Sequence, residues 1–214
     1  MEPKSKMFEK HYNDYLQRIA CLDFNSISRK LGGKIHENQW GKSVKLTFFD
    51  KVYDISSKGI KDTSGKRPIY DICIILFRYL LMCPVTLPHD PQWVSFKDLK
   101  DAGPLTVYFR DNGEKAIAER FAGNTEKLKQ CMAALNGYPT GLDVNYDLAI
   151  QIDALPKVPM LLLFNDADEG FPADCSILFE RTVESYLDAE CIAMLGYQLY
   201  VHLKPLILKF LSPF

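Results

Sequence analysis

The stretch that decides the fold is YDLAIQIDALPKVPMLLLFNDADEGFP, residues 146–172, which holds two β-strand patterns separated by a turn. From Tyr146 to Asp153, apolar and polar residues alternate, which is typical of a strand with one buried and one solvated face. The run MLLLF at 160–164 is continuously apolar and predicts a strand covered on both sides. We therefore expect two neighbouring strands, the second of which leaves the interior at an acidic segment.

Other strand patterns lie on both sides of this stretch. CSILFE at 175–180 predicts a third strand and completes a strand block at 145–180. SVKLTFF and KVYDIS, rich in β-branched and aromatic residues, predict a β-hairpin at 43–56. Because the strands cluster in two blocks and do not alternate with helices, we expect an α+β fold, with a mixed or antiparallel sheet packed against several helices. A length of 214 residues suits a single domain.

Helical patterns fill the rest of the chain. Apolar residues at steps of three and four predict an N-terminal helix at 5–31, which Gly32 and Gly33 stop. A helical middle follows at 68–136, and its first helix, between Pro68 and Pro84, is apolar nearly all round and is expected at the centre of the core.

The ends of two later helices are marked by polar residues, glycine and proline. Asn124 is expected to cap a helix at 125–136 with its side chain, and Gly137 to provide its left-handed exit. Asp188 is expected to cap a C-terminal helix at 189–204, which Pro205 bends or ends before an apolar tail at 205–214.

Composition argues against several functional classes. The formal net charge is −1, from 26 basic and 27 acidic residues, which disfavours a nucleic-acid binder that relies on a general cationic field. The N-terminus lacks the apolar core of a signal peptide, and no stretch is long and apolar enough for a membrane span, so we expect a cytoplasmic protein.

Cysteine and histidine spacing disfavours common metal sites. The six cysteines form no C-x2-C pair, and Cys73, Cys83, Cys131 and Cys191 fall in apolar helical patterns typical of core residues. The four histidines form no H-E-x-x-H pair, and no glycine-rich phosphate loop is present. These patterns identify no cofactor.

The acidic segment FNDADEGFPADC is the strongest candidate site. Asp166, Asp168 and Glu169 directly follow the predicted buried strand, and their mutual repulsion favours solvation or a cation such as calcium or magnesium. An EF-hand register fails, because Ala167 and Ser176 fall where ligands should stand. Three interpretations stay open: a solvated turn in which one carboxylate caps backbone N–H groups, ligand or partner binding that includes Phe171, and catalysis.

Three further features each have two interpretations. His89 and Asp90, between two prolines, are an exposed acid–base pair or a simple turn. Cys175 is a reactive thiol or a core strand residue; nearby carboxylates would raise its pKa, which favours the core position. The apolar tail at 205–214 packs within its own chain or buries itself in a homodimer.

The segment from Ala154 to Leu199 resembles an uncharacterised domain family of anaerobic bacteria and archaea, with WVSFKDL and AERFAGN upstream also similar. The resemblance rests on LP-x-VP, an apolar strand, an acidic turn that ends in FP, and later LF and LG pairs. These positions are Leu155, Pro156, Val158, Pro159, Asp166, Asp168, Glu169, Phe171, Pro172, Leu178, Phe179, Leu195 and Gly196. Some members are fused to a four-cysteine iron–sulfur domain of the corrinoid-protein type, which this chain lacks. The resemblance implies that any iron–sulfur cluster or corrinoid belongs to a partner.

These observations lead to three hypotheses of function. The first is a cytosolic accessory or binding module for an iron–sulfur or corrinoid protein, with Asp166, Asp168, Glu169 and Phe171 as the contact. The second is a metal-dependent enzyme that uses the carboxylates as ligands or as general acid and base. The third is a small-ligand sensor with a pocket between sheet and helices.

Overall fold

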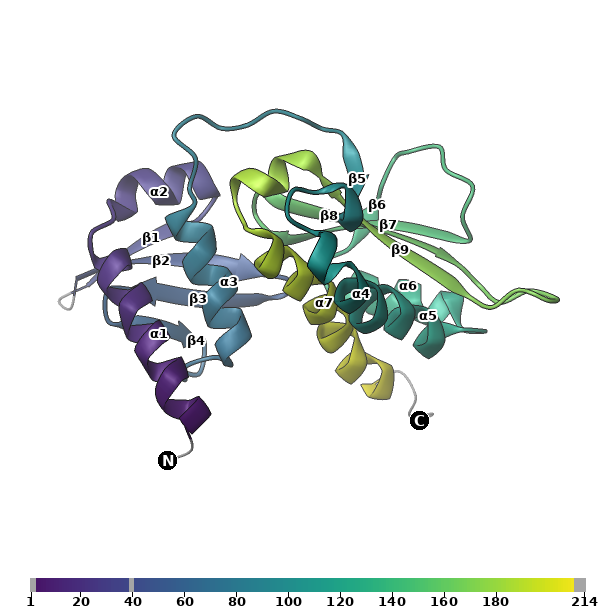
Figure 1. Cartoon of the computed structure of the whole chain (residues 1–214), viewed down its shortest axis with the longest axis horizontal. Helices are drawn as coiled ribbons and strands as arrows, with labels where there is room; N and C mark the ends of the chain where they lie inside the picture. Colours follow the sequence, from purple (N-terminus) through teal and green to yellow (C-terminus); the bar gives the residue numbers. More distant parts are fainter. Residues whose placement is uncertain (1–2, 39–40, 210–214) are drawn as a thin grey trace.

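The computed structural model describes residues 3–38 and 41–209 and confirms the α+β fold. Two antiparallel sheets lie side by side, each with its own helices (Figure 1). Each of the two strand blocks that the sequence predicts therefore forms a sheet of its own.

The first sheet has four strands in the order β1-β2-β3-β4, and each strand pairs with the next along the chain. Two helices precede this sheet and one follows it. The elements are α1 (Pro3–Ala20), α2 (Phe24–Leu31), β1 (Lys34–Asn38), β2 (Gly41–Phe48), β3 (Lys51–Ser56), β4 (Gly59–Asp62) and α3 (Tyr70–Leu81). The predicted hairpin at 43–56 is the central β2–β3 pair, with Phe49 and Asp50 as its two turn residues.

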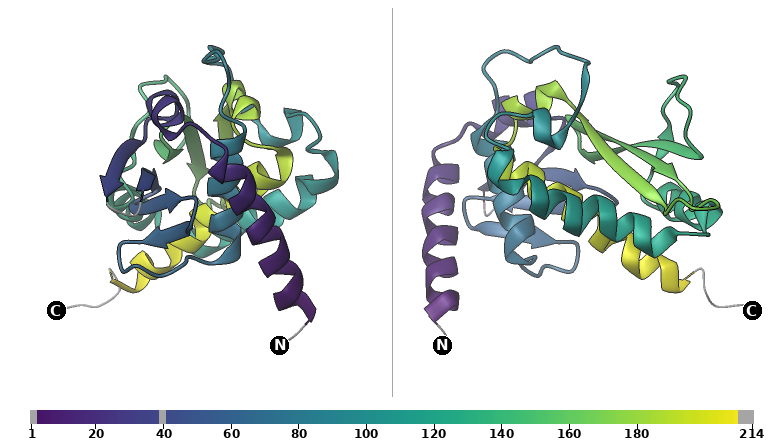
Figure 2. Two further views of the ribbon diagram at one scale, coloured as in Figure 1. Left: turned by 90° about the vertical axis from the view of Figure 1, so that its left-hand side faces the viewer. Right: turned by 45° about the vertical axis from the view of Figure 1, so that its right-hand side comes forward.

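The second sheet has five strands in the order β5-β9-β8-β7-β6. Its strands are β5 (Trp93–Ser95), β6 (Tyr138–Pro139), β7 (Leu148–Leu155), β8 (Val158–Asn165) and β9 (Asp174–Glu180). Its helices are α4 (Thr106–Phe109), a π-helical turn (Arg110–Glu114), α5 (Lys115–Phe121), α6 (Thr125–Ala134) and α7 (Ala189–Lys209). The helices α4 to α7 gather on one face of this sheet, and the opposite face carries none of the described helices (Figure 2).

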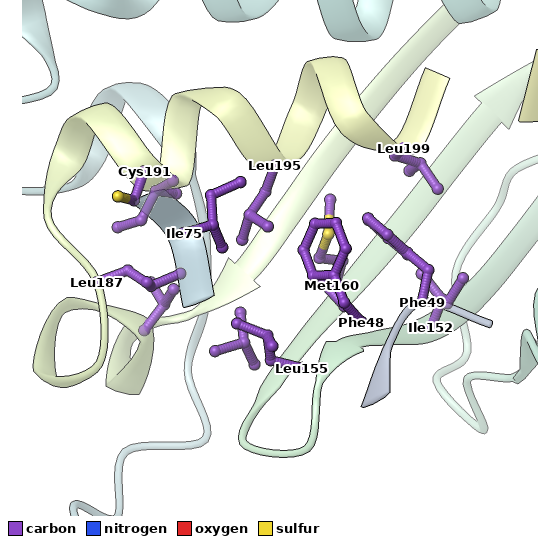
Figure 3. Packing of buried hydrophobic residues seen from close by; sticks show 14 of the residues in the cluster. Phe48, Phe49, Ile75, Ile152, Leu155, Met160, Leu187, Cys191, Leu195 and Leu199 are labelled. Carbon is purple, nitrogen blue, oxygen red and sulfur yellow. The ribbon is translucent and has the colours of Figure 1, made fainter. Parts of the chain in front are cut away.

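Helix α7 closes the core between the two sheets. Its residues Leu195, Leu199 and Leu203 are fully buried. Figure 3 shows Leu195 and Leu199 directed toward Met160 of β8 and toward the phenylalanines at the β2–β3 turn. The apolar surface that α7 buries is a main source of the stability of this arrangement.

Tyr79 of α3 joins the two parts of the molecule by hydrogen bonds. Its ring is fully buried, and its hydroxyl donates to the carbonyl of Leu31 at 3.0 Å. The same oxygen accepts from the N–H of Lys157 in the β7–β8 turn at 3.1 Å. Burial raises the pKa of Tyr79 far above its ordinary value, so the hydroxyl keeps its proton and the donor role.

The run MLLLF is the buried strand that the sequence predicts. Residues 160–164 of β8 are all buried, with relative exposures of 5% or less. Met160, Leu162 and Phe164 belong to the main hydrophobic core. Leu161 and Leu163 point to the other face, because side chains alternate along a strand, and they lie between their partners on β7 and β9.

Three predicted helix boundaries are wrong. The helix at 5–31 is two helices, because Asp23 caps α2 by accepting from Asn25 N–H at 3.0 Å. The helical middle at 68–136 also contains a short strand, β5, after the proline-rich loop that the sequence itself predicts at 84–93. The C-terminal helix does not end at 204 but continues through Pro205 to Lys209, so the first part of the tail is helical. Residues 210–214 of the tail lie outside the described residues, and the homodimer remains a prediction.

Two predictions about the caps of α6 are also wrong. The Asn124 side chain makes no capping hydrogen bond to α6 and donates instead to the carbonyl of Ala122. The left-handed residue after α6 is Asn136, at φ 65°, and not Gly137. Gly137 is required for another reason, since a Cβ there would lie 2.8 Å from the Met132 carbonyl oxygen. The Asp188 cap of α7 is confirmed, with Cys191 N–H donating to its carboxylate at 2.9 Å.

No helix among the described residues combines the length and the hydropathy that a membrane crossing requires.

Candidate functional site

The acidic segment forms the connection between β8 and β9, which projects beyond α5 at the edge of the molecule (Figure 1). Asp168 and Phe171 close a tight turn by two backbone hydrogen bonds, of 3.1 Å and 2.9 Å. Gly170 lies at φ +86°, a conformation that a residue with a side chain rarely adopts. The tip of the connection therefore has a defined shape and is not a loose loop.

Asp166 anchors the base of this turn to the N-terminal end of α6. Its carboxylate accepts from the Thr125 hydroxyl at 2.7 Å, from Gly123 N–H at 2.5 Å and from Ala167 N–H at 2.8 Å. Partial burial raises the pKa of Asp166, but these hydrogen bonds outweigh that effect and lower the pKa overall. Asp166 thus binds the first side chain of α6 and the backbone just before this helix, where Asn124 makes no side-chain cap.

Asp147 fixes the other side of the base. Its carboxylate accepts from Asp166 N–H at 2.7 Å, and its own N–H donates to the Asn165 side chain at 3.3 Å. The turn is therefore tied to the start of β7 as well as to α6. Because the base of the turn is already held in place, residues 168–171 would lose little conformational entropy when they bind a partner.

The other three predicted site residues lie at the tip and face solvent. Asp168 and Glu169 are exposed, and Phe171 is 75% exposed. The Asp168 carboxylate accepts the local N–H of Glu169, at 2.6 Å. The result is an exposed aromatic ring flanked by two carboxylates.

The predicted carboxylates do not converge on a metal site. Asp166 directs its oxygens to three protein donors, whereas Asp168 and Glu169 lie at the tip. Among residues 3–38 and 41–209, no group of three His, Cys, Asp or Glu side chains is arranged to hold a metal ion. The geometry therefore gives no support to the metal-dependent enzyme.

A second candidate site lies on the face of the five-stranded sheet that carries no helix. Asp153 of β7 pairs with Pro159 of β8, and Glu180 of β9 pairs with Trp93 of β5. Met160 pairs with Phe179, so the next residues along these two strands, Pro159 and Glu180, are also neighbours. Asp153, Pro159, Glu180 and Trp93 therefore form one row across the sheet. Asp153, Pro159 and Glu180 line a shallow hollow of about 330 Å³.

A chain of hydrogen bonds fixes the carboxylate of Asp153 at this hollow. The Gln151 amide donates to the Tyr138 hydroxyl at 2.7 Å, and that hydroxyl donates to Asp153 at 3.1 Å. Burial raises the pKa of Tyr138 to about 12, and the charge of Asp153 adds to the increase. Burial also raises the pKa of Asp153, although the bond from Tyr138 opposes this. A cation bound in the hollow would favour the charged form of Asp153.

The proline-rich loop before β5 forms the rim of the hollow. His89 and Asp90 line it, so the structure brings this pair to a polar depression. Lys30 holds the start of the loop by donating to the carbonyl of Val85 at 2.9 Å. Arg181 N–H holds its end by donating to the carbonyl of Gln92 at 2.9 Å.

Sequence reasoning missed Tyr138, Gln151, Asp153 and Glu180 as site residues. The alternation from Tyr146 to Asp153 places Gln151 and Asp153 on the solvated face of a strand, but nothing in it indicates which strands lie beside them. The pairing of Tyr138 with Gln151 depends on a two-residue strand that carries no clear strand pattern.

Cys175 is a core strand residue and not an exposed thiol. It is 4% exposed, and burial raises the pKa of its thiol well above the ordinary value, with Glu114 and Asp174 adding to the effect. Glu114 lies beside it in the π-helical turn and accepts from Ile177 N–H of β9 at 3.0 Å. The pairing of β5 with β9 ends at Ser95 and Leu178. The Glu114 carboxylate therefore accepts the N–H of the next β9 residue, which β5 does not reach.

Comparison with known proteins identifies one family. No curated protein and no solved structure matches the chain. The family described as a domain of unknown function, DUF3786, matches residues 23–201, which include both sheets, the acidic turn and most of α7. The chain therefore belongs to the DUF3786 family of domains of unknown function.

Proposed function

We propose that this protein is a cytosolic accessory module that binds a partner protein through the turn at 168–171. The observation that carries the proposal is the 75% exposure of Phe171, on a turn that Asp166 and Asp147 hold in place. Aromatic side chains are common anchors of protein interfaces, and surrounding charges favour partners of opposite charge. The expected partner surface is an apolar pocket with basic residues around it.

The class of partner protein is proposed from the family resemblance and from the cysteines of this chain. The chain has six cysteines, none in a C-x2-C pair, and all six are free. Its resemblance to domains that are fused to four-cysteine iron–sulfur modules suggests a partner of that type. We therefore propose an iron–sulfur or corrinoid protein of anaerobic metabolism as the partner, which would carry the cofactor itself.

Affinity capture from anaerobic extracts tests this function. The wild-type chain should recover an iron–sulfur or corrinoid protein, identified by mass spectrometry and by its visible absorption. Phe171→Ala should reduce the recovery, because the interface loses its apolar anchor, and Glu169→Gln should weaken it mainly at low salt. Val85→Ala is the matched control, since Val85 is 89% exposed but lies on the proline-rich loop. Equal recovery with Phe171→Ala, or no metalloprotein at all, would contradict the proposal.

The hollow beside Asp153 favours a second candidate function, a small-ligand sensor. The hypothesis from sequence placed such a pocket between sheet and helices, whereas this hollow lies on the opposite face of the sheet. The carboxylates of Asp153 and Glu180 suit a ligand with an amine or guanidinium group.

Calorimetric titration with arginine amide, a guanidinium and amine probe, tests the sensor. Binding should be detectable with the wild-type chain and should be weakened by Asp153→Asn. Asp174→Asn is the control, because Asp174 is an exposed carboxylate at the other end of the same sheet. Absence of heat with the wild-type chain, or equal binding by Asp153→Asn, would remove this candidate.

A further inference from the structure

The C-terminal half of α7 meets the β2–β3 turn at an unusual contact. The ring of His202 lies 4.8 Å from the ring of Phe49 and 5.6 Å from that of Phe48, measured between centroids. Phe49 N–H also donates to the carbonyl of Ala154 in β7 at 2.9 Å. The β2–β3 turn therefore contacts both β7 of the other sheet and the last helix.

Two buried polar side chains in the C-terminal half of α7 carry atoms without a hydrogen-bond partner. Gln198 is fully buried, and neither its amide nitrogen nor its amide oxygen has a hydrogen-bond partner. His202, four residues later on the same helix face, is 7% exposed, and its Nε2 also has no partner. Buried polar groups without partners make a contact less stable than apolar residues of similar size would.

The turn on the other side of the contact carries backbone strain. Phe49 has φ 51°, in the left-handed region that bulky residues rarely occupy. Its ring is nonetheless 2% exposed, so burial against His202 and Phe48 holds the strained conformation. Strain of this kind is often found in segments that change conformation.

We infer that the contact of His202 with the β2–β3 turn is an acid-sensitive latch, and that protonation of His202 releases the end of α7 from the four-stranded sheet. This inference does not depend on the proposed function, because it involves neither the acidic turn nor the hollow. It assigns a conformational role to residues that no other feature of the molecule explains.

The hydrogen bond of His202 shows which ring nitrogen would receive the second proton. Nδ1 lies 2.8 Å from the carbonyl oxygen of Gln198, so in the neutral ring Nδ1 carries the proton and Nε2 is a bare acceptor. Protonation would add an N–H at Nε2 where no acceptor is bonded, and a positive charge between apolar rings. The charged ring is therefore less stable inside the contact than in water.

The neighbouring charges do not remove this effect. Burial is the largest influence on His202 and lowers its pKa from the ordinary value, although the hydrogen bond to the Gln198 carbonyl opposes this. Of the two charged residues at the turn, Lys51 lowers it further and Asp50 opposes the decrease. Tyr53, which contacts Phe48, is buried with its pKa raised to about 12 and remains neutral. Lys204 is exposed on α7 and adds another positive charge nearby.

Pro205 weakens α7 directly after the latch. Proline lacks the N–H that would bond to the carbonyl of Val201, so the helix loses a hydrogen bond one residue before His202. The final turns can therefore separate without unfolding the rest of α7, where Leu195 and Leu199 remain packed.

Hydrogen exchange of the full chain, read by mass spectrometry, tests the latch. Because the pKa is lowered in the closed state, the latch is stable above about pH 6.5 and weakens as pH falls. After correction for intrinsic rates, peptides that cover 46–53 and 199–209 should open up to about tenfold more at pH 5.5 than at about pH 7.5 and above. His202→Gln should remove this dependence, while His11→Gln, at an exposed helix position, should keep it.

Two results would overturn the latch. One is exchange in these peptides that does not depend on pH, or a dependence that persists in His202→Gln. The other comes from an NMR titration of the wild-type chain, which requires no variant to fold: a His202 pKa at or above 6.5 contradicts the buried neutral ring on which the inference rests.

Discussion

The carboxylate of Asp166 accepts a hydrogen bond of 2.7 Å from the hydroxyl of Thr125, which joins the β8–β9 turn to the first residue of α6. Asp166→Ala removes this bond and two backbone bonds, and should lower the free energy of unfolding by about 1 kcal/mol, as loss of a helix cap does. Thermal unfolding followed by circular dichroism measures the change. Glu169→Ala, three residues further along at the exposed tip, should have almost no effect on stability.

The same bonds predict a dependence on pH. Because they lower the pKa of Asp166 below its unfolded value, their contribution is present above about pH 4 and is lost as pH falls through the folded pKa. Wild-type chain should therefore lose more stability than Asp166→Asn between neutral and acid pH. Parallel losses in the two proteins would show that Asp166 is not the titrating group.

Gly196 of α7 should not tolerate a side chain. A Cβ there would lie 2.5 Å from Cε2 of Phe109, whose ring is 2% exposed and stacks on Phe96 at 4.5 Å. Gly196→Ala should destabilise the protein by about 1–3 kcal/mol, as overpacking of a core does. Chemical denaturation measures this value. The double variant with Phe109→Leu should recover part of the loss; equal losses in single and double variants would exclude the clash as the cause.

Tyr79→Phe should destabilise the protein although it removes a single atom. The hydroxyl of Tyr79 pairs with Leu31 and Lys157, and both backbone groups would lose this partner. We expect a decrease of about 1–3 kcal/mol in the free energy of unfolding. Tyr108→Phe is the control, because Tyr108 is 40% exposed. A change no larger than that of the control would show that the two bonds contribute little.

The six cysteines should react with a thiol reagent in a defined order. Cys21 is exposed and Cys83 is partly exposed, whereas Cys73, Cys131, Cys175 and Cys191 are buried. Burial raises the pKa of Cys73 to about 12 and reduces its thiolate fraction further. Maleimide labelling with peptide mass spectrometry should modify Cys21 first, and the four buried thiols only after denaturation. Rapid labelling of Cys175 in the native protein would contradict its position in the core.

The parts of the fold that the sequence predicts depend on local periodicity. The alternation before Asp153 and the apolar run after Pro159 identify β7 and β8, because burial of one or both faces leaves a direct pattern in neighbouring residues. The break between α1 and α2 is harder to predict from the sequence. The apolar spacing of α1 continues to Leu22, and only the next residue, Asp23, marks the start of a new helix. A cap is a single polar residue, which periodicity alone does not detect.

Contacts between distant segments explain the remaining differences. Asn124 stands at the usual capping position, but a carboxylate 42 residues later in the chain, Asp166, binds the first side chain of α6. In the same way, the sequence identifies the acidic cluster as a candidate but cannot separate its structural member, Asp166, from the exposed Glu169 and Phe171. That distinction depends on which side chains have donors in the folded chain.

The position of α7 has a consequence for synthesis of the protein. Its leucines complete a core whose other walls, including Phe48, Ile75 and Met160, come much earlier in the chain (Figure 3). While the ribosome is still adding residues 189–203, the apolar surface that α7 covers in the folded chain is exposed. The nascent chain should therefore need a chaperone until its last helix emerges, and premature termination before Leu195 should produce an aggregating fragment.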